Sequence, residues 1–391
     1  METKTYKLKD YFTVDPSKNT NKYDDYINYI DTSSVVSGEL MTVQHLTEDY
    51  PSRANKRIEK DDILYSSVRP ILKHFYHYEN IIDHAIASTG FCVIRNKNKD
   101  NYSTKFLYYY LSTNQVVSFL DNIAQNSQAT FPSFSKKDLE KIDLPDLPLP
   151  TQRRIASILS TYDALIQNYK RQIAALQSAA SELYKEWFVR FRFPGYKNAK
   201  FDNGLPVGWK YLTLNEIANV IMGQSPESCY YNDNKNGLPF HQGAGSYGDF
   251  YLIDGIYSTE GLRIAEPGSI IFSVRAPVGK LNITINKIIL GRGVAAINSK
   301  EKKNGFLFWS LKTKFSKEDM IGNGSVFASV TKDELLKQKL LIPTNPVLNQ
   351  YDEFASNIEK KIRCLYLQIT NLTTQRDLLL PRLMSGKLSV E

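Results

Sequence analysis

The chain has 391 residues, with 49 Lys and Arg against 41 Asp and Glu, so its formal net charge is +8. Its hydrophobic fraction of 42% and charged fraction of 23% exclude collagen-like, disordered and disulfide-scaffold classes. At about 100–200 residues per domain, this length predicts two or three domains. No apolar run reaches the roughly 18 residues that a bilayer span needs, and the N-terminus lacks a signal-peptide core. We therefore expect a cytoplasmic protein without a membrane partner.

The surplus positive charge is concentrated in one short segment. Residues 151–200 hold nine basic and three acidic residues, whereas residues 1–150 hold 18 basic and 20 acidic ones. A basic excess is typical of proteins that bind nucleic acid, but here the first 150 residues are slightly acidic. If the chain binds DNA, specificity must come from a few side chains that are positioned to contact the bases. The basic residues of 151–200 would then face phosphates or an acidic partner surface.

Residue types used in catalytic and metal sites do not fall in their usual patterns. Cys92, Cys229 and Cys364 lie far apart, and no histidine lies in HExxH or beside a cysteine, so the sequence predicts no metal site. It has no GxxxxGK[ST], no complete GxGxxG and no GxSxG motif. The adjacent carboxylates Asp61 and Asp62 have charged or polar neighbours, and we expect both to be solvated loop residues. The sequence thus predicts no catalytic, cofactor-binding or metal-binding residues.

The second half of the chain repeats the first. Five short motifs recur in the same order, with each pair about half a chain apart. The pairs are 8–11 with 214–217, 63–70 with 270–277, 106–111 with 306–311, 131–136 with 327–332, and 152–157 with 350–356. Each match is weak alone, but five in one order indicate two copies of one unit.

Each copy is predicted to be a globular part followed by a long helix. The globular parts alternate short β-rich runs with turn signals such as Asn-Gly, and they contain short stretches with apolar residues at helical spacing. The β-rich runs are 63–68, 269–274 and 287–290, and the helical stretches are 106–111 and 306–311. We therefore predict α+β domains at 1–150 and 201–345, a first helix with its linker at 151–200, and a second helix at 346–391.

The two helical segments carry the pattern of a coiled coil, with apolar residues alternating at spacings of three and four. Arg376 interrupts this seam, and Pro381 is expected to end or kink the second helix. One such stripe usually faces a domain core, but two equivalent stripes in two repeats favour antiparallel pairing with approximate twofold symmetry. The residues predicted at the helix-pair interface are Tyr162, Leu165, Tyr169, Ile173, Leu176, Leu183, Ile358, Ile362, Leu365, Ile369, Leu372 and Leu379.

Several motifs of the second repeat are shared with a known family. They are GLPVGW at 204–209, GQSP at 223–226, GLPFHQG at 237–243, SVRAPVG at 273–279 and GRG at 291–293, and the helical segments add PLPTQRRI at 148–155 and LLPRLMSG at 379–386. Together these motifs resemble the specificity subunits of type I DNA restriction-modification enzymes. The first globular part differs more, because it has SSVRP at 66–70 and no GQSP motif.

This resemblance implies a subunit without catalysis of its own. Each globular part would be a target-recognition domain for one half of a bipartite double-stranded DNA site, and the paired helices would be the spacer that sets the gap. Two copies of a modification subunit would bind S-adenosylmethionine and methylate adenine. A restriction subunit, an ATP-dependent translocase and nuclease, would cleave unmethylated DNA. The resemblance therefore places S-adenosylmethionine, ATP and Mg in partner subunits and no cofactor in this chain.

Candidate base contacts lie in polar segments beside the predicted strands. Arg69 and Arg275 follow equivalent β-rich runs, and an arginine there can contact guanine through two hydrogen bonds or bind a phosphate. A solvated or structural arginine is equally compatible with the sequence. The further candidates are Lys73, His74 and Gln128 in the first domain and Gln224, Ser225, Gln242, Lys280 and Arg292 in the second.

Two other functions stay open at this point. A coiled-coil adaptor that binds proteins would also suit an aromatic content of 12% with 25 tyrosines. DNA binding that is sequence-specific only with a methyltransferase partner would distinguish the specificity subunit from that adaptor. A self-sufficient DNA methyltransferase or nuclease is disfavoured by the missing motifs, and turnover of S-adenosylmethionine by the purified chain would support it.

Overall fold

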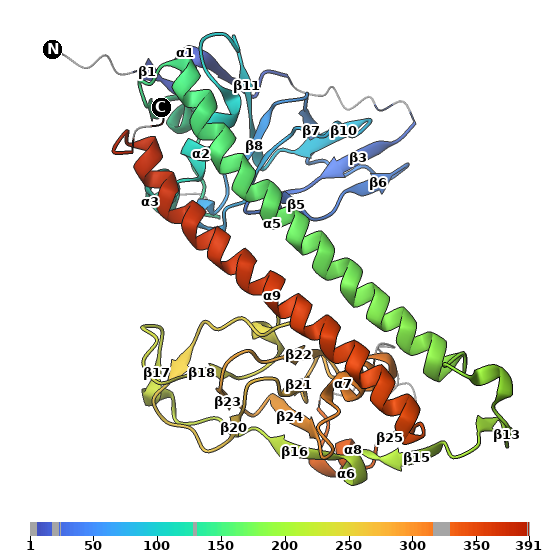
Figure 1. Ribbon diagram of the computed structural model, residues 1–391. Coiled ribbons are helices and arrows are strands. Elements are labelled where there is room, and N and C mark those ends of the chain that lie inside the picture. The colour runs from blue at the N-terminus through green and yellow to red at the C-terminus, as the bar shows by residue number, and fades with distance from the viewer. Residues whose placement is uncertain are drawn as a thin grey trace. The chain divides into compact units, whose positions relative to one another are not determined.

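The computed structural model describes residues 6–17, 23, 25–127, 131–315, 329–388 and 390 (Figure 1). The chain divides into two compact units: unit 1 comprises residues 1–168 and 369–391, and unit 2 comprises residues 169–368. The long helices α5 (Leu149–Tyr184) and α9 (Asn345–Met384) each contribute one part to each unit. This grouping cuts both helices, so it does not test the domain borders predicted from the sequence.

Unit 1 contains two four-stranded sheets. Neighbouring strands are antiparallel in the first sheet, and its order is β2 (Phe12–Val14), β11 (Phe91–Asn96), β8 (Ile63–Ser66) and β9 (Phe75–His77). The second sheet has the order β6 (Gln44–Leu46), β3 (Ile27–Ile30), β10 (Ala85–Ser88) and β7 (Ala54–Arg57). Only the β3–β10 pair of this sheet is parallel. Among the described residues, unit 1 also has two short strand pairs: β1 (Tyr6–Lys7) with β12 (Asp143–Leu144), and β4 (Val35–Val36) with β5 (Glu39–Leu40).

Helices cover the first sheet of unit 1 and close its core. They are α1 (Leu8–Tyr11), α2 (Thr104–Ser112), α3 (Asn114–Gln125) and α4 (Lys136–Glu140). Ser103 and Thr113 cap α2 and α3 by accepting hydrogen bonds from backbone N–H groups of the first turn. Buried residues of this core include Phe106 of α2, Leu159 of α5 and Leu383 of α9. The ends of both long helices therefore belong to the core of the first globular part.

Unit 2 also contains two sheets, together with helices α6 (Leu214–Ile217), α7 (Asn304–Phe315) and α8 (Lys332–Leu336). One sheet has the order β16 (Ala218–Met222), β24 (Val294–Ser299), β21 (Ile270–Ser273) and β22 (Leu281–Ile283). The other has the order β17 (Tyr231–Asn232), β19 (Tyr257–Ser258), β18 (Leu238–His241), β23 (Ile288–Leu290) and β20 (Ile264–Ala265). The short pairs are β13 (Phe201–Asp202) with β14 (Leu205–Pro206), and β15 (Lys210–Thr213) with β25 (Lys339–Ile342).

The strand topology of unit 2 repeats that of unit 1. The sheet β16-β24-β21-β22 has the same order and antiparallel pairing as β2-β11-β8-β9. The parallel pair β18–β23 corresponds to β3–β10, and an antiparallel strand flanks each pair on both sides. The predicted tandem α+β repeat is therefore confirmed, as are the helical stretches at 106–111 and 306–311. One of the five repeated motifs, at 327–332, lies partly outside the described residues.

Within each unit, the parts of α5 and α9 contact each other. In unit 1, the Arg376 guanidinium donates a 2.6 Å hydrogen bond to one carboxylate oxygen of Asp163, and the Tyr109 hydroxyl donates to the other at 2.6 Å. In unit 2, the Tyr351 hydroxyl donates to the Ala180 carbonyl at 3.1 Å. Within unit 1, Leu159 shares a core with Leu383 and Asp163 pairs with Arg376, so residue numbers rise along one helix as they fall along the other, which confirms antiparallel pairing. Arg376, which interrupts the seam in the sequence, is thus an ion-pair partner of α5.

Burial and ionic contacts act in opposite directions on the Arg376 guanidinium. Burial acts to lower the pKa of Arg376, but the hydrogen bond and charge of Asp163 outweigh it and raise that pKa above its ordinary value. Removing Arg376 would leave the half-buried Asp163 carboxylate without its cation, which costs more than the pair itself contributes, whereas Arg376 also pairs with Asp377 at 2.8 Å. The pair therefore favours one register of α5 against α9 in unit 1.

The predicted seam residues differ in burial. Ile173, Ile358, Ile362 and Leu365 are buried, and Tyr162, Tyr169, Leu176, Leu183, Ile369 and Leu372 are half-buried. Leu379 packs against the core of the first globular part. Leu165 is 37% exposed, whereas its neighbour Ile166 is buried. Residues repeated every seven positions do not stay on one face of a helix with 3.6 residues per turn. The position that faces the partner helix therefore moves by one residue. For Leu165, a place at the helix-pair interface stays a prediction.

The helix α9 does not end at Pro381, as one reading of the sequence expected. It continues to Met384, and the Ser385 N–H donates a 3.1 Å hydrogen bond to the Pro381 carbonyl. Proline lacks its own N–H donor but keeps a carbonyl acceptor, so a helix can run one more turn beyond it.

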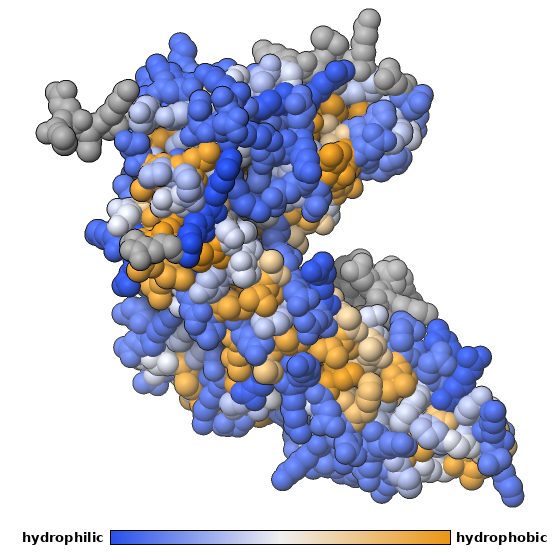
Figure 2. All heavy atoms as spheres, turned by 45° about the horizontal axis from the view of Figure 1, so that its top comes forward, coloured by the Kyte–Doolittle hydropathy of each residue, from blue (hydrophilic) through white to orange (hydrophobic). Residues whose placement is uncertain are grey.

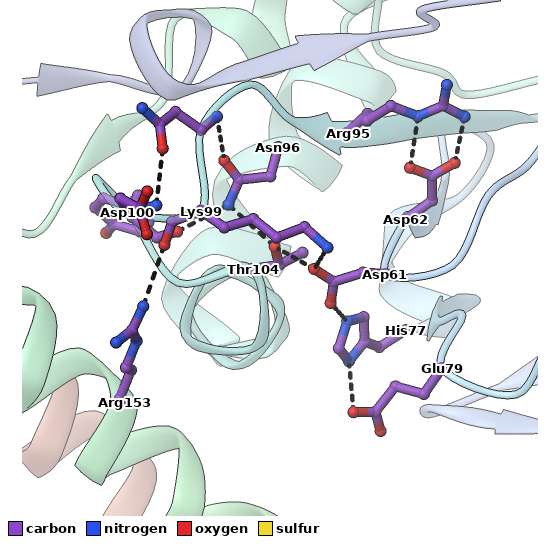
Figure 3. A network of polar contacts seen from close by, with 12 residues as sticks. Asp61, Asp62, His77, Glu79, Arg95, Asn96, Lys99, Asp100, Thr104 and Arg153 are labelled. Atoms are coloured by element: carbon purple, nitrogen blue, oxygen red, sulfur yellow. Dashed lines mark hydrogen bonds and ion pairs between the residues drawn. The ribbon is translucent and has the colours of Figure 1, made fainter.

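The expectation that Asp61 and Asp62 are solvated is wrong, as Figure 3 shows. The Asp62 side chain is 1% exposed and receives hydrogen bonds from Arg95 Nε at 2.9 Å and Nη2 at 2.7 Å. Asp61 contacts His77 Nε2 and Lys99 Nζ, each at 2.8 Å. Burial acts to raise the pKa of Asp61, but these hydrogen bonds outweigh it and lower that pKa to about 2. Both carboxylates thus hold β8, β9 and β11 together.

Candidate nucleic-acid interface

Four segments of unit 2 meet where its central strands end. The Gln224 N–H donates to the Leu290 carbonyl, and the Gly291 N–H donates to the His241 carbonyl, both at 2.9 Å. The Gly293 N–H donates to the Gln242 carbonyl, and the Val274 N–H donates to the Gly293 carbonyl, again at 2.9 Å. We call this set of segments, residues 223–225, 242–243, 274–275 and 291–293, the loop junction.

Glycines allow the backbones of the loop junction to approach closely. A Cβ atom on Gly223 would lie 2.0 Å from the Gly291 carbonyl oxygen, and one on Gly291 would lie 2.6 Å from the Gln242 Cα. A Cβ on Gly293 would lie 2.4 Å from the Gln242 carbonyl oxygen. No other residue fits at these distances without moving backbone atoms. The glycines of the GQSP and GRG motifs are therefore explained by close backbone packing.

The loop junction brings five predicted contact residues together. Gln224, Gln242, Arg275 and Arg292 are exposed there, and Ser225 is half-buried. The Ser225 hydroxyl accepts a 3.1 Å hydrogen bond from the Arg292 N–H, so the GQSP and GRG segments are joined directly. In the major groove, an arginine guanidinium can donate two hydrogen bonds to guanine, and a glutamine amide can donate to adenine N7 while accepting from adenine N6–H. The junction thus presents the chemistry of base recognition on a fixed backbone.

His241, whose carbonyl accepts the Gly291 N–H of the loop junction, is the centre of a buried hydrogen-bond network. The sequence did not predict this network. His241 is buried, with Nδ1 2.8 Å from Ser246 Oγ and Nε2 3.0 Å from an Asp254 carboxylate oxygen. The Asn286 amide donates to the other Asp254 oxygen at 2.6 Å. Burial acts to raise the pKa of Asp254, but the hydrogen bonds from His241 and Asn286 outweigh it and lower that pKa. The histidine of the GLPFHQG motif was the available signal.

The arginine loops of the two repeats connect equivalent strands. In unit 2 the loop runs from β21 to β22, where the Ser273 hydroxyl donates to the Pro277 carbonyl at 2.7 Å and the Lys280 N–H donates to Ser273 Oγ at 2.8 Å. The Lys280 side chain is exposed. In unit 1 the loop runs from β8 to β9, and the exposed Arg69 guanidinium lies 5.6 Å from the centre of the Phe131 ring. The sequence thus located the two loops correctly.

Two of the other candidates in unit 1, Lys73 and His74, are hydrogen-bonded to other residues of the chain. Lys73 Nζ donates a 2.9 Å hydrogen bond to Asn114 Oδ1, and the half-buried His74 ring is hydrogen-bonded to the Val35 carbonyl. Gln128 lies outside the described residues. For these three, a DNA contact stays a prediction, and Lys73 and His74 would have to exchange an internal partner for DNA.

Unit 1 also differs from unit 2 at the place of Gly223. The residue after β2 is Asp15, whose carboxylate accepts hydrogen bonds from Lys56 Nζ at 2.7 Å and from the Val93 N–H at 3.0 Å. The Lys56–Asp15 ion pair is largely buried. In unit 1 a charged pair therefore lies at the strand end where unit 2 has close glycine packing.

Neither a metal-binding cluster nor a membrane-spanning helix is found in the part of the chain that the structure describes. Those residues contain no group of three or more His, Cys, Asp or Glu side chains that could hold a metal ion. Among them there is also no helix with the length and apolar character that crossing a membrane requires.

Comparisons with known proteins agree with this architecture. A family model described as "Type I restriction modification DNA specificity domain" matches residues 1–178 and 206–370. The MjaX specificity subunit of Methanocaldococcus jannaschii is 32% identical over 255 residues, which cover 63% of this chain and 59% of that protein. The HindI specificity subunit of Haemophilus influenzae is 22% identical over an alignment that covers 97% of this chain and 99% of that protein.

A solved structure shows the same fold. The S subunit of a type I restriction-modification system from M. genitalium aligns with a TM-score of 0.59 at 14% identity, covering 97% of this chain and 95% of that one. The two family matches span both repeats and most of the chain. This chain therefore belongs to the family of type I restriction-modification DNA specificity subunits.

Proposed function

We propose that this DNA specificity subunit recognises a bipartite site, with one half-site bound by each globular domain. The observation that supports it is the repeat itself. The β8–β9 loop and the β21–β22 loop join equivalent strands of equivalent sheets, and each presents an exposed arginine. Two domains that share a topology but differ in their loop residues can bind two half-sites of different sequence.

In the second domain, the loop junction would make the base contacts. Arg275 can donate two hydrogen bonds to guanine O6 and N7, and the amides of Gln224 and Gln242 can pair with adenine. Arg292 and Lys280 are exposed cations that would neutralise phosphates and fix the register on the duplex. In the first domain, Arg69 would take the role of Arg275.

The paired helices would set the gap between the half-sites. An α-helix rises about 1.5 Å per residue and DNA about 3.4 Å per base pair, so one added helical turn corresponds to roughly two base pairs. The Asp163–Arg376 pair supports this proposal, because it favours one register of α5 against α9 in unit 1.

Catalysis would belong to partner subunits. Two copies of a modification subunit would bind S-adenosylmethionine and methylate adenine, and a restriction subunit would use ATP and Mg to translocate and cleave DNA. We propose that this chain supplies no catalytic residue and binds no cofactor. The basic residues of 151–200 are available for the partners or for phosphates over the gap.

Co-expression with a candidate modification subunit tests the proposal. Methylated adenines mapped across a genome should fall in one bipartite motif with a fixed gap. A coiled-coil adaptor would give no methylation that depends on this chain, and turnover of S-adenosylmethionine by the purified chain alone would contradict the division of labour.

The spacer role has a sharper test in the same assay. One helical turn is added after the exposed Ala174 of α5, together with a matching turn after the exposed Cys364 of α9. The gap should lengthen by about two base pairs while both half-sites keep their sequence. Changed half-sites with an unchanged gap would show that the helices do not set the spacing.

Single substitutions should separate the two half-sites. Arg275→Ala is expected to relax or weaken recognition of one half-site by about 10-fold or more, because an arginine–guanine pair contributes about 1–3 kcal/mol of discrimination. Arg69→Ala should have the same effect on the other half-site only. Methylation of a library with every single-base change in the site measures both. Equal loss at both half-sites would instead indicate a defect in folding or assembly.

A further inference from the structure

The turn Pro70–Leu72 of unit 1 presents two large apolar side chains to solvent beside Arg69. Ile71 is 53% exposed and Leu72 is 49% exposed. Figure 2 shows that hydrophobic patches occur within a mostly hydrophilic surface on one face of the chain. Single exposed apolar residues are common in proteins, but two neighbours on a short turn within the loop that carries Arg69 need a reason.

This turn is held rigidly. The Leu72 N–H donates to the Arg69 carbonyl at 3.0 Å, and the Ile71 N–H donates to Asp121 Oδ1 at 3.3 Å. Arg69 at φ 47° and Lys73 at φ 55°, on either side of the turn, are both in the left-handed region. Non-glycine residues adopt that region at an energetic cost, and such conformations cluster at functional sites. These contacts hold the backbone that presents the apolar pair.

The second repeat does not present this apolar pair. At the equivalent place, Val278 is half-buried and Gly279 is buried, and a Cβ atom on Gly279 would lie 3.2 Å from the Phe315 Cβ. The loop can thus be closed by packing its tip against α7. Exposure of Ile71 and Leu72 is a property of the first domain and not a requirement of the fold.

The surroundings of the turn favour DNA as its occupant. Arg69 directly precedes the turn in the sequence, and its guanidinium lies 5.6 Å from the centre of the exposed Phe131 ring. In the major groove, thymine presents a 5-methyl group next to base acceptors, and phosphates border the groove. An apolar tip flanked by a cation is complementary to that pattern, whereas a hydrophobic protein partner would not require the guanidinium.

We propose that Ile71 and Leu72 are specificity-determining residues that contact thymine 5-methyl groups in the half-site bound by the first domain. This inference rests on the proposed function and adds the chemical group that the apolar pair recognises. It predicts that this half-site contains at least one thymine whose methyl group contributes to binding, independently of the guanine contacts expected of arginine.

The test is a double-mutant cycle with the assembled complex of specificity and modification subunits. Binding is measured on the mapped site and on the same site with deoxyuridine replacing every thymidine of that half-site. The wild type should lose about fourfold in affinity per contacted methyl, which is the value of one buried carbon group. The Ile71→Ala/Leu72→Ala variant should bind the thymidine site more weakly and should lose little further on the deoxyuridine site.

Three controls make the outcome decisive. Leu72→Met keeps an apolar side chain and should retain most of the thymidine preference. Ile81→Ala removes another exposed isoleucine of unit 1 and should change neither affinity. Deoxyuridine in the other half-site should not couple to the double variant. Equal weakening of the double variant on both DNAs, or a wild type indifferent to deoxyuridine, would overturn the inference, while a missing bipartite motif would refute the proposed function itself.

Discussion

Gly223→Ala is expected to destabilise unit 2 by roughly 3 kcal/mol and to abolish recognition of one half-site. The new Cβ would lie 2.0 Å from the Gly291 carbonyl oxygen and 2.8 Å from that of Val294, so backbone on two neighbouring segments would have to move. The backbone hydrogen bonds of the loop junction depend on those positions, and Gln224 follows directly. Loss of stability and loss of base recognition should therefore appear together.

The matched control for this prediction is Gly243→Ala. Gly243 belongs to the same loop junction, but its backbone is extended, at φ −173°, and a Cβ there meets no atom within 4 Å. It should change stability by no more than about 0.5 kcal/mol. Trp187, Trp209 and Trp309 all lie in unit 2, so urea unfolding followed by tryptophan fluorescence measures this unit directly. Equal effects of the two substitutions would contradict the close-packing argument.

Arg95→Ala is expected to destabilise unit 1 by about 3 kcal/mol, the second large effect. Arg95 holds both oxygens of Asp62, and the Asp62 side chain is 1% exposed, so the substitution leaves a buried carboxylate without its cation. Hydrogen exchange should rise first in β11, which contains Arg95, and in β8, which begins directly after Asp62. Recognition of the half-site bound by unit 2 should be affected less than that of the first.

Two variants control for the charge itself. Lys7→Ala breaks the exposed ion pair with Asp143 in the same unit and should cost less than about 1 kcal/mol. Replacing both members of the buried pair, as Asp62→Leu with Arg95→Met, should recover stability relative to Arg95→Ala, because neither charge is then left unpaired. If the double variant is as unstable as Arg95→Ala, the packing of the side chains, and not the unpaired charge, determines stability at this pair.

The sequence alone determined the organisation of this protein. Repeated motifs located two equivalent α+β domains, and apolar residues at alternating spacings of three and four located two long helices, because local periodicity reflects the face that each element buries. The places of Arg69 and Arg275 on equivalent loops followed from the same repeat. Each of these features is set by residues that lie near one another in the sequence, so the sequence alone is enough to predict them.

The tertiary structure alone decided which side chains meet. It joined Gln224, Gln242 and Arg292 through backbone contacts that only glycine permits, and it paired Asp62 with Arg95 and Arg376 with Asp163. It also exposed Ile71 and Leu72, whereas at the equivalent positions of the second repeat Val278 is half-buried and Gly279 is buried. The physical reason is that hydrogen bonds, ion pairs and burial depend on distance in space. Residues far apart in the chain come close enough for these contacts only when the sheets and helices pack.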